Sequence, residues 1–232
     1  MKQRSSALRT PRRPVTRRIT ERAARKGETH QRILKSAVNL ARRQGLAAAS
    51  VPRVMRGAGL TVGGFYAHFD SKTAMDAELI RTMFGTLPGP WLDGLDDFSG
   101  LEWLARAVKR YLSVAHRETP DGCGYPAVIS EVSRAGAEVR AAFAEAVELR
   151  VRILGAHSPE LPGITPRERA IATLALVVGG LLLARATRGA GISDDMLNAC
   201  RKWALPEADA GSDAARTPAT AVANKRRRAR GR

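Results

Sequence analysis

The chain has 232 residues, a 44% share of hydrophobic side chains and a formal net charge of +17. This length allows one domain or two small ones, and the apolar content is sufficient for a packed core. The charge favours a polyanionic partner such as nucleic acid. The two cysteines, Cys123 and Cys200, lack the spacing of a zinc site and predict a reduced, cytoplasmic protein without a metal, with a disulfide between them as the alternative.

The positive charge is concentrated in particular segments. Residues 1–27 carry +9 and residues 28–74 carry +5, whereas residues 75–205 carry −1 and residues 206–232 carry +4. Residues 1–27 and 205–232 are rich in charge and poor in apolar side chains, so we expect two disordered basic tails. An arginine-rich transit peptide is the alternative for the first tail, and a merely solubilising end is the alternative for the second. The layout is typical of a basic nucleic-acid-binding end joined to a neutral body.

The first predicted helices are short. Apolar residues at helical spacing between residues 33 and 41 predict a first helix, which Gly45 is expected to end. Ser50 is expected to cap a second helix, Gly57 and Gly59 to break it, and Thr61 to cap a third. A fourth helix is predicted from Ser71 to about Phe84.

The remaining sequence also predicts helices. They cover residues 99–116, shorter pieces as far as 135, residues 139–149, 165–187 and 193–203, and no strand is expected. Thr165-Pro-Arg-Glu168 has the form of a capping box with proline at the first helical position. The apolar run 171–184 is too short to span a bilayer and predicts a buried helix without a membrane role. Gly179-Gly180 within it would allow close helix approach, either in the core or at a two-fold interface.

The segment AGLTVGGFYAHFDSK, residues 58–72, resembles the signature of the tetracycline-repressor (TetR) family of bacterial regulators. The resemblance covers about residues 28–80, and over residues 85–204 it extends only to the general all-α layout. It implies an all-α fold with a three-helix helix-turn-helix DNA-binding domain at 28–74. A linking helix would lead to a ligand-binding and dimerisation domain at 75–204. It also implies a homodimer on a double-stranded DNA operator, a small-molecule inducer, repression as the usual outcome, no cofactor, and a cytoplasmic, nucleoid-associated location.

The resemblance and the chemistry of the residues together indicate the DNA contacts. Phe65 and Phe69 lie four apart and are expected to anchor the third helix to the first. Gly63 and Gly64 would allow close approach of DNA, or else tight packing between helices. Val62 would meet a thymine methyl, or else belong to the core. The expected DNA-binding residues are Ser50, Arg53, Thr61, Val62, Gly63, Gly64, Tyr66, His68 and Lys72.

Base-reading groups are sparse in the third helix, TVGGFYAH. It contains none of the Arg, Lys, Asn and Gln side chains that make bidentate contacts with base edges. Specificity is therefore expected to depend on operator shape and on the basic segment 1–24.

The predicted ligand pocket rests on the larger aromatic and polar side chains of the body, each of which could equally belong to the core: Trp103, Tyr111, His116, Tyr125, Glu131 and Phe143. No catalytic residues are predicted, because GAGLTVGG has the wrong spacing for a nucleotide loop and neither HExxH nor GxSxG occurs. A non-specific architectural DNA-binding protein is the alternative function, although a large neutral body argues against it.

Overall fold

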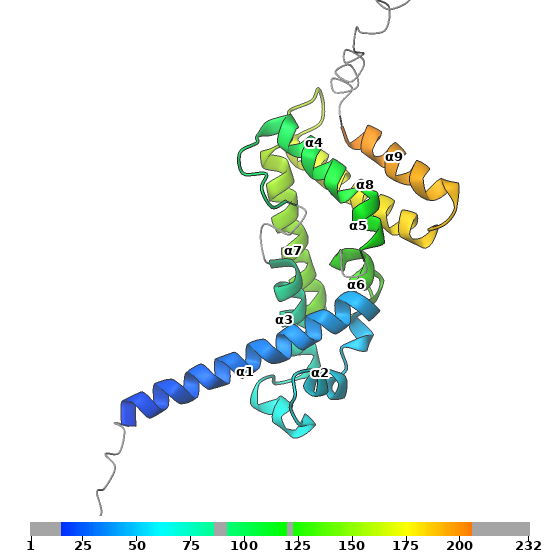
Figure 1. The fold of residues 1–232 in the computed structure, drawn as a ribbon. Coiled ribbons are helices and arrows are strands. Elements are labelled where there is room, and N and C mark those ends of the chain that lie inside the picture. Colours follow the sequence, from blue (N-terminus) through cyan, green and yellow to red (C-terminus); the bar gives the residue numbers. More distant parts are fainter. Residues whose placement is uncertain (1–14, 86–91, 120–122, 206–232) are drawn as a thin grey trace, which may run out of the picture. The chain divides into compact units, whose positions relative to one another are not determined.

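The computed structural model describes residues 15–85, 92–119 and 123–205, and within these ranges the chain is helical almost throughout and has no strand (Figure 1). The all-α prediction is therefore confirmed. Two 3-10 helices, η1 (Leu46–Ala48) and η2 (Val62–Ala67), flank α2. The α-helices are α1 (Val15–Gln44), α2 (Val51–Gly57), α3 (Lys72–Gly85), α4 (Gly100–Tyr111), α5 (Val114–Glu118), α6 (Gly124–Val132), α7 (Ala137–Ala156), α8 (Pro166–Ala186) and α9 (Gly191–Ala204).

Helix α1 corrects the prediction that residues 1–27 form a disordered arm, because it begins at Val15 and runs for 30 residues. Residues 1–14 lie outside the described residues. The stretch 15–27 consists largely of Arg, Ala, Glu and Lys, which are good helix formers despite their charge. The packed half of α1 provides the nucleus on which this stretch extends. Side chains 22–28 are all exposed, so Arg22, Arg25 and Lys26 face solvent.

The chain divides into two compact units, which differ from the predicted domains. The first unit comprises residues 1–87 and 120–147, and the second comprises 88–119 and 148–232. The predicted boundary after residue 74 is not the boundary of the first unit, because α3 packs on α1 and α6 packs on α1 and η1. Residues 206–232 of the predicted basic tail lie outside the described residues.

The core of the first unit lies where α1 contacts α2 and α3. Ile33, Leu34, Ala37 and Ala41 form the predicted apolar face of α1 and are at most 1% exposed. Side chains from α2 and α3 that are buried with them include Val54, Met55, Met75, Leu79 and Ile80. This core holds the short elements that follow α1 in a fixed arrangement.

The second unit is built on the pairing of α8 with α9, and α4 and α5 also contact α8. The predicted capping box opens α8: the Glu168 N–H donates to Thr165 Oγ1 at 3.2 Å, and the Thr165 N–H donates to Glu168 Oε2 at 2.9 Å. A Cβ at Gly180 would lie 2.6 Å from Cys200 Sγ, whereas one at Gly179 would meet nothing within 4 Å. Gly180 therefore permits the close approach of α9, and Gly179 lies on the open side of α8.

Helix α8 is, within the described ranges, the one helix long and apolar enough to cross a membrane, and half of its apolar window is buried in the protein. The burial agrees with the predicted core helix. Its exposed positions are also apolar: Ile171 is 47% exposed, Leu182 38% and Leu183 50%.

Candidate DNA-binding surface

The turn between α2 and η2 has a defined hydrogen-bond pattern. Gly59 adopts φ +67°, a conformation that favours glycine. Its N–H donates to the Arg56 carbonyl at 3.0 Å, and the Leu60 N–H donates to the Met55 carbonyl at 2.9 Å. These two bonds form a Schellman motif, which ends α2 and redirects the chain into η2.

Phe65 and Phe69 hold η2 on the rest of the unit, as predicted. Phe65 is fully buried and Phe69 is 4% exposed, and their ring centroids lie 5.4 Å apart. Phe69 also stacks on the His30 ring of α1 at 4.5 Å. The predicted third helix is a 3-10 helix rather than an α-helix, and these two rings fix its position.

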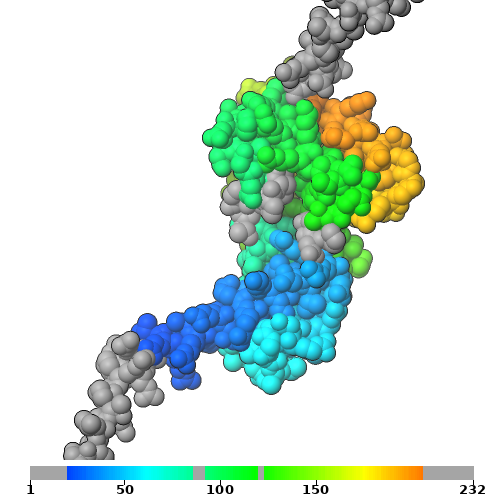
Figure 2. All heavy atoms as spheres, viewed as in Figure 1, coloured from blue at the N-terminus to red at the C-terminus, as the bar shows by residue number. Residues whose placement is uncertain are grey.

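The side chains that precede and follow Phe65 point outward. Thr61 is exposed, Val62 is 48% exposed and Tyr66 is 72% exposed. A core role for Val62, which the sequence left open, is therefore wrong. In Figure 2 the segment that holds α2 and η2, drawn in cyan, forms an exposed face of the first unit. This surface presents one aliphatic, one hydroxyl and one phenol side chain to solvent.

The glycines of η2 are not required by packing within the protein. A Cβ at Gly63 would meet nothing within 4 Å, and a Cβ at Gly64 would make an ordinary 3.6 Å contact with Met55 Cε. Neither residue has a positive φ. Tight packing between helices, the alternative weighed for this pair, instead applies to Gly57, where a Cβ would lie 2.3 Å from Ser36 Oγ. The open side of Gly63 leaves the backbone of η2 accessible to a partner.

Three further predicted contacts flank η2. Ser50 and Thr61 occupy N-cap positions, but neither side chain makes the expected capping hydrogen bond. Arg53 Nη2 donates to Gln44 Oε1 at 2.6 Å, which orients the guanidinium at the edge of α2. The hydroxyls of Ser50 and Thr61 are therefore not used to cap α2 and η2.

Lys72, at the first turn of α3, pairs with Asp76. Its Nζ lies 2.6 Å from Oδ1 and 2.5 Å from Oδ2 of that carboxylate. Burial raises the pKa of the Asp76 carboxyl, and the hydrogen bond from Lys72 opposes this shift. The side chain of Lys72 remains 38% exposed, so its ammonium is positioned but still accessible.

His68 ends η2 and is half-buried, with its Nδ1 buried and without a hydrogen-bond partner. Burial lowers the pKa of His68, and nearby His30 and Lys26 lower it further by charge repulsion. A neutral imidazole donates a hydrogen bond but adds no positive charge. His68 would therefore contribute a hydrogen bond, and no charge attraction, to a phosphate contact.

The residues predicted to line a ligand pocket lie in several separate places. In the first unit, Tyr125 and Phe143 pack on each other and on Phe84, with ring centroids 4.5 to 5.7 Å apart. In the second unit, Trp103 stacks on His157 at 3.9 Å, and the His116 Nδ1 lies 2.7 Å from the Tyr111 carbonyl oxygen. The cavity described below is lined by other residues.

Glu131 has a role that differs from the predicted one. From α6 it accepts hydrogen bonds from the Leu46 N–H at 2.9 Å and the Ala47 N–H at 2.5 Å, at the start of η1. Gly45, at φ +88°, leaves room for this carboxylate, since a Cβ there would lie 2.1 Å from Glu131 Oε1. No local pattern predicts this contact, because the partners are about 85 residues apart.

Comparisons with known proteins agree with this geometry. Residues 33–79 match the family model described as bacterial regulatory proteins, tetR family. No curated protein matches the chain significantly.

Solved structures share its fold. The reduced form of NemR from E. coli is 19% identical with a TM-score of 0.63, and the match covers 75% of this chain and 96% of that one. A TetR-family regulator from Agrobacterium tumefaciens is 18% identical with a TM-score of 0.61, covering 78% and 100%. FadR from Bacillus subtilis, in complex with stearoyl-CoA, is 14% identical with a TM-score of 0.57, covering 75% and 97%. Residues 33–79 thus match the helix-turn-helix segment of the tetR family of bacterial regulatory proteins, and the described residues have the all-helical fold of these solved structures.

Proposed function

We propose that the protein is a ligand-responsive repressor that binds a palindromic DNA operator as a homodimer and is released by a small-molecule inducer. The observation that carries the DNA-binding part is the exposed surface of η2, where two glycines that the protein's own packing does not require stand beside outward-facing Tyr66. A backbone without side chains can approach DNA closely, and flanking hydroxyl and basic groups can contact phosphates.

In this proposal the contacts divide into two kinds. Ser50, Tyr66, His68 and Lys72 bind phosphate oxygens and set the orientation of η2 in the major groove. Thr61 and Val62 meet base edges, with Arg53 beside them and Gly63 and Gly64 allowing the approach. Because so few groups read bases, operator shape and the basic helix before residue 28 supply the rest of the specificity.

The dimer is supported by an apolar face on the second unit. The exposed side of α8 carries apolar residues at helical spacing: Ile171, Ala172, Ala175, Leu182, Leu183 and Ala186. On α9, the apolar residues Ile192, Met196, Ala199 and Trp203 recur at helical spacing on a side that is exposed or half-buried. An exposed apolar surface of this extent is typical of an interaction site. A two-fold pairing of these faces would present two copies of η2 to half-sites about 34–36 Å apart, or a multiple of that spacing.

Release by an inducer requires that the ligand bind two conformations of the dimer with different affinity. A conformation in which the two copies of η2 lie at a different separation would lose contact with one half-site. FadR, which has a similar fold, is solved with a bound acyl-CoA, and this supports ligand binding by a protein of this architecture.

Selection of bound sequences from random DNA, followed by footprinting, tests the proposal. A sequence-specific regulator selects one short two-fold symmetric site and protects it alone. The alternative, a non-specific architectural DNA-binding protein, would give diffuse protection and no enriched motif, and that result would overturn the proposal.

The basic segment at the start of the chain contributes to operator binding in this proposal. Removal of residues 2–24 is expected to weaken operator binding and to make the plot of log affinity against log salt concentration less steep, because fewer phosphate charges are neutralised. Removal of residues 225–232, which are also strongly basic, is the control for charge alone. An unchanged slope in the first variant would show that this segment does not contact DNA.

A further inference from the structure

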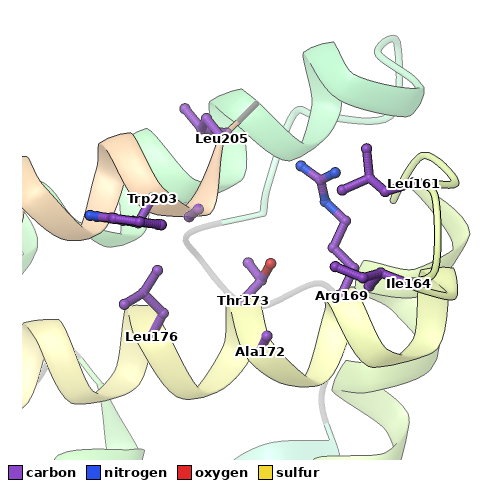
Figure 3. Close-up of a pocket in the computed structure, with 9 residues that line it drawn as sticks. Leu161, Ile164, Arg169, Ala172, Thr173, Leu176, Trp203 and Leu205 are labelled. Carbon is purple, nitrogen blue, oxygen red and sulfur yellow. The ribbon is translucent and has the colours of Figure 1, made fainter. Parts of the chain in front are cut away.

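A cavity of about 450 Å³ lies in the second unit, between the first half of α8, the loop that precedes it and the end of α9 (Figure 3). Its volume lies within the range of small-molecule sites. Most of its lining is apolar: Leu161, Ile164, Ala172, Leu176, Trp203, Ala204 and Leu205, together with Thr173 and Arg169.

Arg169 is the one charged residue in this lining. Its side chain extends from α8 toward the space between Leu161 and Leu205, as Figure 3 shows. The residue is only 8% exposed, and its Nη1 is buried without a hydrogen-bond partner. Burial lowers the pKa of the Arg169 guanidinium, because the charged form has lost water. An uncompensated buried charge is costly, and an anion placed beside it would remove that cost.

A neighbouring arginine shows the contrast. Arg167, two residues earlier on α8, is exposed and forms a bidentate pair with Glu148 at 2.5 and 2.8 Å. Arg169 forms no such pair with a carboxylate in the described part of the chain. The planar fork of a guanidinium matches a carboxylate with two parallel hydrogen bonds. The Arg169 guanidinium faces an apolar cavity, so a molecule complementary to this site has both an anionic and an apolar part.

We propose that this cavity binds a small carboxylate with an apolar body, whose carboxylate pairs with Arg169 and whose body packs against Leu161, Ile164 and Trp203. The indole of Trp203 is 84% exposed at the rim and supplies a flat apolar surface. The site shares Ala172 and Trp203 with the apolar face formed by α8 and α9, so an occupant would contact the surface proposed for subunit pairing. The effect on DNA rests on the proposed function, whereas the binding itself does not.

Titration calorimetry of the full chain tests the site, with decanoate as the aliphatic probe and 2-naphthoate as the aromatic one. At least one of the two carboxylates should bind, and decan-1-ol or 2-naphthol should bind at least about tenfold more weakly, since the neutral head group cannot pair with a guanidinium. Arg169→Gln should weaken carboxylate binding by about tenfold or more, and Arg169→Lys should weaken it less. Arg167→Gln is the matched control and should leave the affinity unchanged.

Three results would overturn the proposal. These are no binding of either carboxylate, binding of the alcohols as tight as that of the carboxylates, or an Arg169→Gln variant that unfolds cooperatively and binds carboxylate as tightly as the parent chain does. A change in subunit association in Arg169→Gln, with no carboxylate binding to the parent chain, would instead assign the cavity to a second copy. Operator affinity measured with and without the carboxylate distinguishes the proposed binding site from the proposed release of the operator by an inducer. A carboxylate that binds through Arg169 without altering operator affinity would contradict the proposed induction by this ligand while the site itself stands.

Discussion

Within the six residues of η2, neighbouring side chains differ in burial. Phe65 is buried and joins η2 to the core, whereas Tyr66 beside it is 72% exposed. Gly63 has neither a packing requirement nor a positive φ. Its lack of a side chain therefore has no structural benefit inside the protein, and the proposed benefit is contact with DNA.

Replacement of Gly63 by alanine tests that benefit. The added Cβ meets nothing within 4 Å, and alanine restricts the unfolded chain, so the free energy of unfolding should stay level or rise by about 0.4–1 kcal/mol. Operator affinity should nevertheless fall by about tenfold or more, because the methyl group would occupy the space of the DNA backbone. Denaturant unfolding and fluorescence anisotropy measure the two quantities.

Gly85→Ala is the matched control, since a Cβ at Gly85 at the end of α3 also meets nothing within 4 Å. It should change neither operator affinity nor the fold. Undiminished operator binding by the Gly63→Ala variant would exclude close backbone approach at this position.

At the scale of elements, the sequence predicted local features well and long-range contacts poorly. The Thr165–Glu168 capping box and the turn at Gly59 follow from residues close together in the chain, and both are present. The 3-10 geometry of η2 was not predicted, because a six-residue segment carries too little periodicity to distinguish two helix types. Glu131 was assigned to a pocket because nothing local links it to Gly45.

Glu131 joins α6 to η1, and its loss should destabilise the first unit. In Glu131→Gln the side chain keeps its size but offers one neutral carbonyl oxygen to two backbone donors, so one N–H loses its acceptor and the other keeps only an uncharged one. The free energy of unfolding should fall by about 1–3 kcal/mol, measured by denaturant titration. Glu138→Gln, on the exposed first turn of α7, is the control and should have little effect. Equal stability of the two variants would show that the Glu131 contacts contribute nothing.

The apolar sides of α8 and α9 yield a prediction about assembly. Leu183→Glu places a charge on the exposed face of α8, so the dimer should dissociate to monomers and operator affinity should fall with it. Sedimentation velocity measures the first effect and gel shift the second. Val114, on α5, is equally exposed at 50%, and Val114→Glu should leave the dimer intact. A Leu183→Glu variant that remains dimeric would exclude this face as the interface.

At the scale of the whole molecule, the sequence separated a basic end from a neutral remainder, but it placed the structural boundary differently. Charge indicates which residues face a polyanion, whereas compact units follow from packing, and α6 packs on α1 although about 80 residues separate them. The high charge of residues 15–27 also led to a wrong prediction of disorder, because these residues are helical. A charged, apolar-poor composition predicts disorder only where the segment does not continue a helix that is already packed on a core.

Two half-buried histidines make the stability of the protein depend on pH. Burial lowers the pKa of His116, against the opposing hydrogen bond with the Tyr111 carbonyl, and burial lowers the pKa of His157. The unfolded chain therefore takes up protons first as the pH falls. The free energy of unfolding should decrease as the pH is lowered through about 6.5. Denaturant titrations from pH 8 to pH 5 measure this change.

His157→Phe separates this effect from the general increase in positive charge at low pH. The substituted ring can still stack on Trp103 but cannot titrate, so the decrease should become smaller. An identical pH dependence in the variant would show that His157 does not contribute to it.

The division of tasks within η2 has an evolutionary consequence. Phe65 and Phe69 secure the element from inside, while Thr61 and Val62 are exposed beside it. In the proposed function, folding and target choice are therefore encoded by different residues of one short segment. After gene duplication, a copy can change these two side chains and acquire a new operator without first losing stability.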